Sequence, residues 1–213
     1  GRSPAAAICR VSSDNTVSVH VGSVDISGVN SSLVLIAAEI LDVPPDQVVL
    51  IQGDTRDGPY AGPSGGSQTT YSVSGAVAGA ARVVRERLLK VASDHFEVGT
   101  EDLEMSGGFV GVKGVPDRRI SIGELAQIAE SHNNGDGPII GEGRSTLERS
   151  ASGFVVHLAK VAVDPDTAQV TLKQYVAVQD VGFALNPTMV EGQIHGGSVQ
   201  GIGWGLYEQM VYD

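Results

Sequence analysis

The pattern of apolar and polar positions predicts a strand–strand–helix–strand–helix unit in the first part of the chain. Residues 7–12 and 16–22 read as a pair of strands joined by a turn, with valines at alternate positions of the second. Apolar residues between 33 and 41 recur at helical spacing, and Ser31 or Ser32 is expected to cap that helix. A short buried strand over 47–52 and a long helix over 68–91 complete the unit.

The rest of the chain predicts smaller pieces. A short strand is expected over 108–113, and Ser121 with Glu124 forms a capping box that opens a helix. A hairpin over 154–179 precedes a glycine-rich helix that begins at Asn186 and Pro187. We therefore expect an α+β fold of two-layer units with mixed sheets. A first lobe spans 1–131, a connecting loop 132–152, and a hairpin with a helix 153–213.

Composition narrows the function classes. The 213 residues include 14 Lys and Arg against 25 Asp and Glu, which gives a formal charge of −11. Such an acidic chain argues against nucleic-acid binding and against anionic membranes. No apolar run approaches the roughly 20 residues that span a bilayer. A single cysteine, Cys9, excludes an intrachain disulfide and a thiolate metal site built from this chain alone, and is compatible with the cytoplasm.

Glycine is abundant, with 28 residues, and the last predicted helix holds six of them between 192 and 205. Each glycine in a helix costs up to about 1 kcal/mol relative to alanine. The simplest compensation is a close approach to another backbone or to a bound group. Gln193 on this helix is then either a polar group carried into a crowded place or a solvated side chain.

A second place for chemistry is the loop over 63–70, which enters the long helix. Its glycines allow backbone N–H groups to approach a ligand, its hydroxyls donate and accept, and a helix N-terminus favours an anion. The loop can cradle a phosphate or a polar heterocycle, or it can be an ordinary capped helix start. The five histidines show no ligand spacing, and no Gly-x-Ser-x-Gly elbow is present.

Several motifs occur in an order that resembles a known family. They are Ile36–Leu41 before Val43-Pro44, Gly53-Asp54-Thr55, Gly65-Gly66-Ser67-Gln68-Thr69-Thr70, Asp180-Val181-Gly182, Asn186-Pro187, Gly192-Gln193-Ile194-His195-Gly196-Gly197 and Gln200-Gly201-Ile202-Gly203. The chain resembles the molybdenum-cofactor-binding large subunit of the xanthine dehydrogenase, aldehyde oxidase and carbon monoxide dehydrogenase family. The resembling part is the second cofactor-binding region of that subunit.

The resemblance implies a bacterial, cytoplasmic oxidoreductase with a molybdenum-pterin cofactor in its cytosine dinucleotide form. It implies hydroxylation of an aldehyde or an N-heterocycle with water as the oxygen source. The implied partners are the remaining segments of a large subunit, iron–sulfur and flavin subunits or domains, and a small-molecule substrate.

The resemblance also assigns cofactor contacts. These are Ser64, Gly65, Gly66, Ser67, Gln68 and Thr69 in the loop before the long helix, Gln193 in the last helix, and Ser27, Gly28 and Asn30 where the family has a Gly-Gln-Gly loop. The family's catalytic Glu lies in a Gly-x-Gly-Glu motif that this sequence lacks. We therefore expect no catalytic and no metal-ligating residue here, and an isolated fragment that is inert and free of cofactor. The alternative is a non-catalytic scaffold that keeps the fold.

Overall fold

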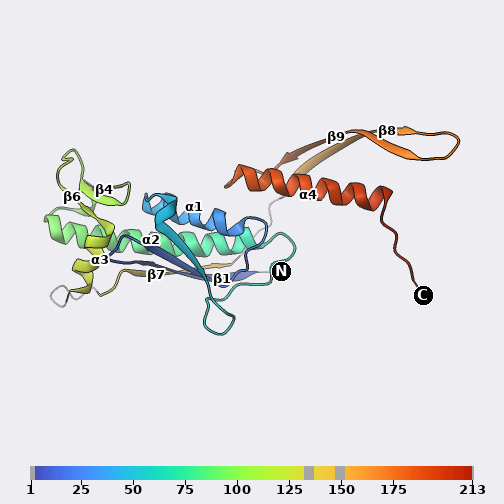
Figure 1. The fold of residues 1–213 in the computed structure, drawn as a ribbon. Helices are drawn as coiled ribbons and strands as arrows, with labels where there is room; N and C mark the ends of the chain where they lie inside the picture. Colours follow the sequence, from blue (N-terminus) through green and yellow to red (C-terminus); the bar gives the residue numbers. More distant parts are fainter. Residues whose placement is uncertain (1–2, 132–136, 147–151, 213) are drawn as a thin grey trace. The chain divides into compact units, whose positions relative to one another are not determined.

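The computed structural model describes residues 3–131, 137–146 and 152–212. The chain divides into two compact units, Gly1–Arg149 and Ser150–Asp213, called unit 1 and unit 2. Both combine strands with helices, which confirms the α+β class with mixed sheets (Figure 1). The predicted division at 131 and 152 stays a prediction, because 132–136 and 147–151 lie outside the described residues.

A four-stranded sheet forms the centre of unit 1, in the order β3-β2-β1-β7. Its strands are β1 (Pro4–Val11), β2 (Val17–Val21), β3 (Val48–Gln52) and β7 (Ile140–Thr146). β1 runs antiparallel to both β2 and β7, whereas β3 is parallel to β2. Helices α1 (Val29–Leu41) and α2 (Thr69–Phe96) contact each other and pack against the sheet as a second layer (Figure 1).

This topology gathers several chain segments at one edge of the sheet. Register pairs Val21 of β2 with Ala7 of β1 and with Gln52 of β3, so β2 and β3 end where β1 begins. The segments 22–28 and 53–68 therefore leave the sheet at the same edge, and each leads into a helix. The Ala6 N–H donates to the Tyr60 carbonyl at 2.8 Å, which ties the longer segment to β1. We call 22–28, 53–68 and the first turns of α1 and α2 the loop edge.

Strand β7 lies within the range that the sequence predicted as a connecting loop. Its two glycines are the reason for the difference. A Cβ at Gly143 would collide with the Ala76 carbonyl oxygen of α2, and one at Gly141 with the Ala80 carbonyl oxygen. The glycines let the strand lie directly against α2, and they are not a sign of a turn.

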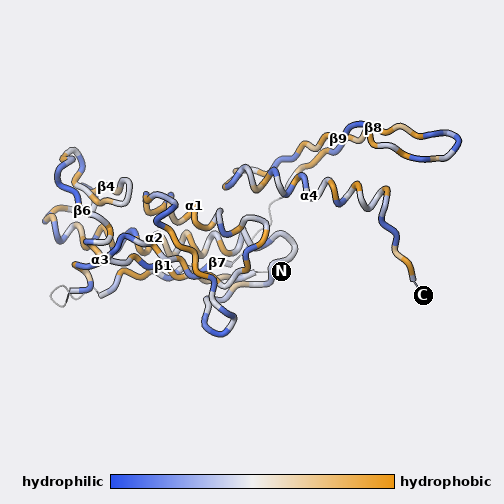
Figure 2. Tube along the Cα trace, in the orientation of Figure 1, coloured by the Kyte–Doolittle hydropathy of each residue, from blue (hydrophilic) through white to orange (hydrophobic). Residues whose placement is uncertain are grey.

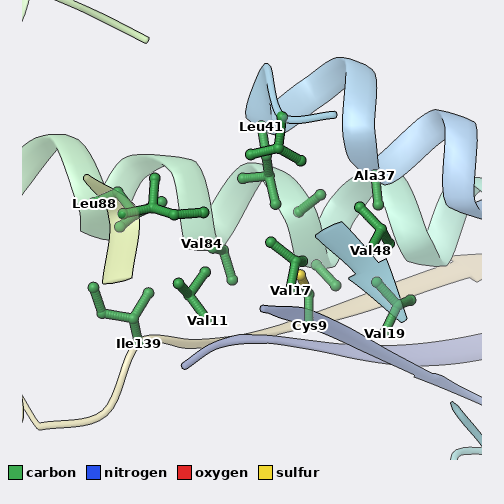
Figure 3. Packing of buried hydrophobic residues seen from close by; sticks show 14 of the residues in the cluster. Cys9, Val11, Val17, Val19, Ala37, Leu41, Val48, Val84, Leu88 and Ile139 are labelled. Atoms are coloured by element: carbon green, nitrogen blue, oxygen red, sulfur yellow. The ribbon is translucent and has the colours of Figure 1, made fainter. Parts of the chain in front are cut away.

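The core of unit 1 lies between the sheet and the two helices. Fully buried side chains from β1, β2, α1 and α2 form one cluster, which includes Cys9, Val19, Leu41 and Leu88 (Figure 3). Burial raises the pKa of the Cys9 thiol to about 12. The lone cysteine is therefore a small apolar core residue, protonated near neutral pH.

A smaller sheet and helix extend unit 1. The antiparallel strands are β4 (Leu103–Ser106), β5 (Phe109–Val112) and β6 (Arg119–Ser121), and the short 3-10 turns are Pro45–Gln47 and Thr100–Asp102. Helix α3 (Ile122–Glu130) begins with the complete capping box predicted from Ser121 and Glu124. The Glu124 N–H donates to the Ser121 hydroxyl at 3.2 Å, and the Ser121 N–H donates to the Glu124 carboxylate at 3.0 Å.

Unit 2 consists of a hairpin and one helix. Strands β8 (Phe154–Val163) and β9 (Val170–Asp180) pair antiparallel, and α4 (Pro187–Leu206) has the predicted Asn186 cap, whose side chain accepts from the Met189 N–H at 3.3 Å. Every residue of β8 is exposed. Apolar residues recur along the hairpin and α4 (Figure 2). Across the described ranges, no helix is long and apolar enough to cross a membrane.

Candidate functional site

Both helices of the loop edge are entered through two consecutive residues with positive φ. Ser27 and Gly28 have φ of 58° and 71° before α1, and Gly66 and Ser67 have φ of 62° and 58° before α2. This left-handed region is uncommon for residues other than glycine and costs of order 1 kcal/mol or more. Each turn holds one serine in this unfavourable region. Contacts outside the turn must therefore help to hold the backbone in this conformation.

The N-termini of these two helices lack side-chain caps. The N-cap residues are Gly28 for α1 and Gln68 for α2; neither makes a capping bond, and neither first turn holds an acidic residue. The predicted cap at Ser31 or Ser32 is wrong, because α1 begins at Val29 and Ser32 Oγ donates instead to the Gly28 carbonyl at 3.3 Å. Uncapped first-turn N–H groups carry partial positive charge and suit an anionic ligand.

Side-chain bonds within the second loop hold its shape and leave its glycines open. Gln68 Nε2 donates to the Pro63 carbonyl at 2.9 Å, and the Thr69 hydroxyl donates to Ser64 Oγ at 3.2 Å. No atom lies within 4 Å of the place where a Cβ would sit on Gly65 or Gly66. The loop is therefore a braced stretch of bare backbone with hydroxyl groups on either side.

The first loop is held by a residue that sequence reasoning missed. Gln52, at the end of β3, donates through Nε2 to the Ser23 carbonyl at 2.7 Å and to Asn30 Oδ1 at 3.0 Å. Ser23 is 4% exposed, and its hydroxyl has no hydrogen-bond partner among the residues that the structure describes. The sequence alone does not mark this residue, because it is the parallel pairing of β2 with β3 in the structure that brings Gln52 level with the start of this loop.

Gln193 belongs to α4 and thus to unit 2, which is described by itself. Gln193 is exposed, and so are its helical neighbours Gly192 and Gly196. For five of the six glycines of this stretch, no described atom lies within 4 Å of the place where a Cβ would sit. These five are Gly192, Gly196, Gly197, Gly201 and Gly205. The close neighbour that the glycines predicted is not supplied by the described residues.

The donor set at the loop edge fits a polar, anionic ligand. It offers helix N–H groups, the hydroxyls of Ser64, Ser67 and Thr69, and bare glycine backbone. Neither first turn holds a carboxylate, and the acidic residues of the edge, Asp25, Asp54 and Asp57, lie in its loops. In the ranges that the structure describes, no three His, Cys, Asp or Glu side chains come together as a metal site.

The resolved carboxylate pKa shifts belong to turns and caps. Hydrogen bonds from the Ser121 side chain and main chain lower the pKa of Glu124, and N–H donors at Asp166 and Thr167 lower that of Asp164. The pKa of Asp14 is lowered in the same way by Thr16. These groups stabilise local structure, and none of the three lies at the loop edge.

The chain matches known proteins along its whole length. The family model of the molybdopterin cofactor-binding domain matches residues 1–213. The nicotine 6-hydroxylase large subunit of Paenarthrobacter nicotinovorans is 35% identical over 206 residues, covering 90% of this chain and 25% of that protein. The chain thus spans about a quarter of the length of that relative.

Solved structures show the same fold. Quinoline 2-oxidoreductase from Pseudomonas putida 86 matches with a TM-score of 0.86 and 29% identity, over 99% of this chain and 28% of that one. Carbon monoxide dehydrogenase from Oligotropha carboxidovorans matches with a TM-score of 0.88 and 25% identity, over 98% of this chain and 26% of that one.

Proposed function

The chain belongs to the molybdopterin cofactor-binding domain family of molybdenum hydroxylases, and from this premise we propose that its loop edge binds the organic part of a molybdenum-pterin cofactor. The observation that carries the proposal is the pair of uncapped, acid-free helix N-termini at one edge of one sheet. Both termini favour negative charge nearby, and the phosphate groups of the cofactor would supply that charge.

Each predicted contact residue has a role in this proposal. Gly65 and Gly66 have no side chain, so a ligand can approach their main chain directly. Ser64, Ser67 and Thr69 add hydroxyl groups. Gln68 braces this loop through its bond to Pro63. Ser27, Gly28 and Asn30 form the second wall of the loop edge. Gln193 lies in unit 2, and its contact to the pterin stays a prediction from the family resemblance.

The chemistry follows from the bound group, which supplies molybdenum-centred hydroxylation with oxygen from water. The substrate class that we propose is an aldehyde or an N-heterocycle; the relatives named above include a nicotine hydroxylase and a quinoline oxidoreductase. The residues of this chain bind and orient the cofactor, whose proposed form is the cytosine dinucleotide.

The working protein in this proposal is larger than the 213 residues. The nicotine relative is a large subunit, and the chain spans a quarter of it. We expect further large-subunit segments, iron–sulfur and flavin partners and a cytoplasmic location. Exposed apolar residues in unit 2, such as Phe154 and Trp204, support a covering surface of that kind.

The test is the cofactor content of the protein purified from its native host, with and without Gly65→Ala. An added Cβ on Gly65 meets no atom of the chain, so the fold should be unchanged, whereas a cofactor against that backbone would be displaced. We expect molybdenum and a pterin nucleotide in the wild type, and at least a tenfold lower content in Gly65→Ala.

A matched control is Gly153→Ala, where the new Cβ would lie 3.5 Å from the Asp180 carbonyl oxygen in ordinary contact. It should retain full cofactor content. A folded wild-type protein without molybdenum and pterin would contradict the proposal and favour the scaffold alternative. Full content in Gly65→Ala would remove the second loop from the site.

A further inference from the structure

We propose that Gln52 is a positioning residue, which fixes the Asn30 carboxamide so that its NH2 group is free to donate to an anionic group of the ligand. The inference rests on the proposed function for the identity of that ligand. The hydrogen-bond pattern that carries it does not depend on the ligand.

The orientation follows from what each group can do. The Ser23 carbonyl can only accept, so the Gln52 group 2.7 Å from it must be the donating Nε2. The same nitrogen lies 3.0 Å from the Asn30 side chain and uses its second proton there. A donor requires an acceptor opposite, so Asn30 must present Oδ1 to Gln52. Its Nδ2, with two protons, then points away from Gln52.

The position of Asn30 gives this orientation a consequence. Asn30 is the second residue of α1, whose first turn holds no acidic residue and whose N-cap is Gly28. The Nδ2 donors thus belong to the same helix end as the uncapped N–H groups. With the opposite orientation, an amide oxygen would face an approaching anion and repel it.

The buried residue Ser23, whose carbonyl accepts from Gln52, indicates that the contacts around Gln52 do more than fill space. Its hydroxyl is buried without a partner, although its own carbonyl is held by Gln52. An unsatisfied buried hydroxyl costs of order 1 kcal/mol or more. This hydroxyl is enclosed by the chain, so what Gln52 holds in place at this point is the main chain of Ser23.

The orientation is tested on the 213-residue chain by NMR of the side-chain amides of Gln52 and Asn30. Gln52 is an exposed residue, so the expectation is comparative: both of its Nε2 protons, each hydrogen-bonded, should exchange more slowly with water than the two Asn30 Nδ2 protons. In Asn30→Asp, which still accepts, the Gln52 protons should stay protected. In Asn30→Leu one of them should become exposed. Loss of protection in Asn30→Asp would show that Asn30 is the donor and would overturn the inference.

The consequence for binding is tested by titrating the same chain with inorganic pyrophosphate. We expect shifts at the α1 first-turn amides, and a Kd about tenfold weaker in Gln52→Leu, the loss of one hydrogen bond to a charged group. Gln52→Lys, which can donate to both acceptors, should restore binding. In the Asn30→Leu background, Gln52→Leu should add nothing. The control Gln174→Leu, on an exposed strand of unit 2, should bind as the wild type does.

The outcomes separate this inference from the proposed function. If pyrophosphate shifts the α1 amides but Gln52→Leu changes the Kd less than twofold, the positioning role is wrong and the loop edge remains an anion site. If pyrophosphate leaves the α1 amides unshifted in the wild type, both the role of Gln52 and the assignment of Ser27, Gly28 and Asn30 are wrong. Amide dispersion of each variant shows that it has folded.

Discussion

Units 1 and 2 both hold many apolar residues but differ in where these residues lie. In unit 1, α1, α2 and the main sheet enclose one buried cluster. In unit 2, Phe154, Phe183 and Trp204 are 75%, 88% and 74% exposed. Since monomeric proteins rarely expose large contiguous apolar patches, we expect another surface to cover the apolar residues of unit 2. An apolar pattern predicts an element but not the partner of its apolar face.

The hairpin shows this difference residue by residue. Phe154, Val156 and Leu158 alternate along β8 and share one face, where Val178 and Val176 pair with the last two. All five are exposed. The opposite face is partly covered, since Tyr175 and Ala177 are of intermediate burial. One face of the hairpin is therefore the larger uncovered apolar surface.

The largest test of the comparison is the same truncation in each unit. Leu88→Ala removes a fully buried side chain of α2 and should lower the free energy of unfolding by about 3 kcal/mol. Leu158→Ala removes an exposed one and should change it by less than about 0.5 kcal/mol. Urea unfolding of the 213-residue chain measures both. Equal effects would contradict the difference between the units.

Glycine-to-alanine substitutions should have opposite signs in the two units. Gly143→Ala forces a Cβ into the backbone of α2 and should cost about 2 kcal/mol. Gly197→Ala on α4 meets no atom and should raise helicity, with a gain of up to about 1 kcal/mol in helix formation. Circular dichroism and thermal unfolding report both changes. A destabilising Gly197→Ala in the 213-residue chain would mean that α4 is already packed.

Helix caps give a smaller contrast. Ser121→Ala breaks the capping box of α3 and should cost unit 1 about 1 kcal/mol. Asn186→Ala removes the cap of α4 and should reduce the helicity of unit 2 while the thermal midpoint of unit 1 stays unchanged. Thermal scans that follow Cys9 accessibility and total helicity separate the two. A shift of the unit 1 midpoint in Asn186→Ala would show that the units unfold together.

The smallest expected effect is the pH dependence that the helix cap of α3 gives to unit 1. Hydrogen bonds from Ser121 hold the pKa of Glu124 below its usual 4.5. The stability that this bond adds is therefore present above pH 4.5 and is lost as the pH falls through the lower folded value. Glu124→Gln should flatten this part of the acid titration of unit 1. An unchanged acid titration would show that the Glu124 carboxylate does not contribute to the stability of the cap.

Local signals predicted more of this molecule than long-range contacts did. The cap at Ser121, the hairpin turn and the Asn186-Pro187 helix start depend on residues a few positions apart, and the structure has all three. Strand β7 was missed because its glycines allow it to pack closely against α2, which is far away in sequence. Gln52 was missed because its partner Asn30 lies 22 residues away, across two elements. The loop over 64–69 was marked by its composition and the residues 27–30 by the family resemblance, but their shared edge needed the register of the sheet.

The most direct test of the account is hydrogen exchange along the backbone, measured on the 213-residue chain and on the protein from its native host. In the chain alone, α2 should exchange slowly and α4 fast, because only α2 is enclosed. In the native protein, α4 and the apolar face of β8 should become protected as well. Protection of α4 equal to that of α2 in the chain alone, or fast exchange of α4 in the native protein, would contradict a unit 2 that another surface completes.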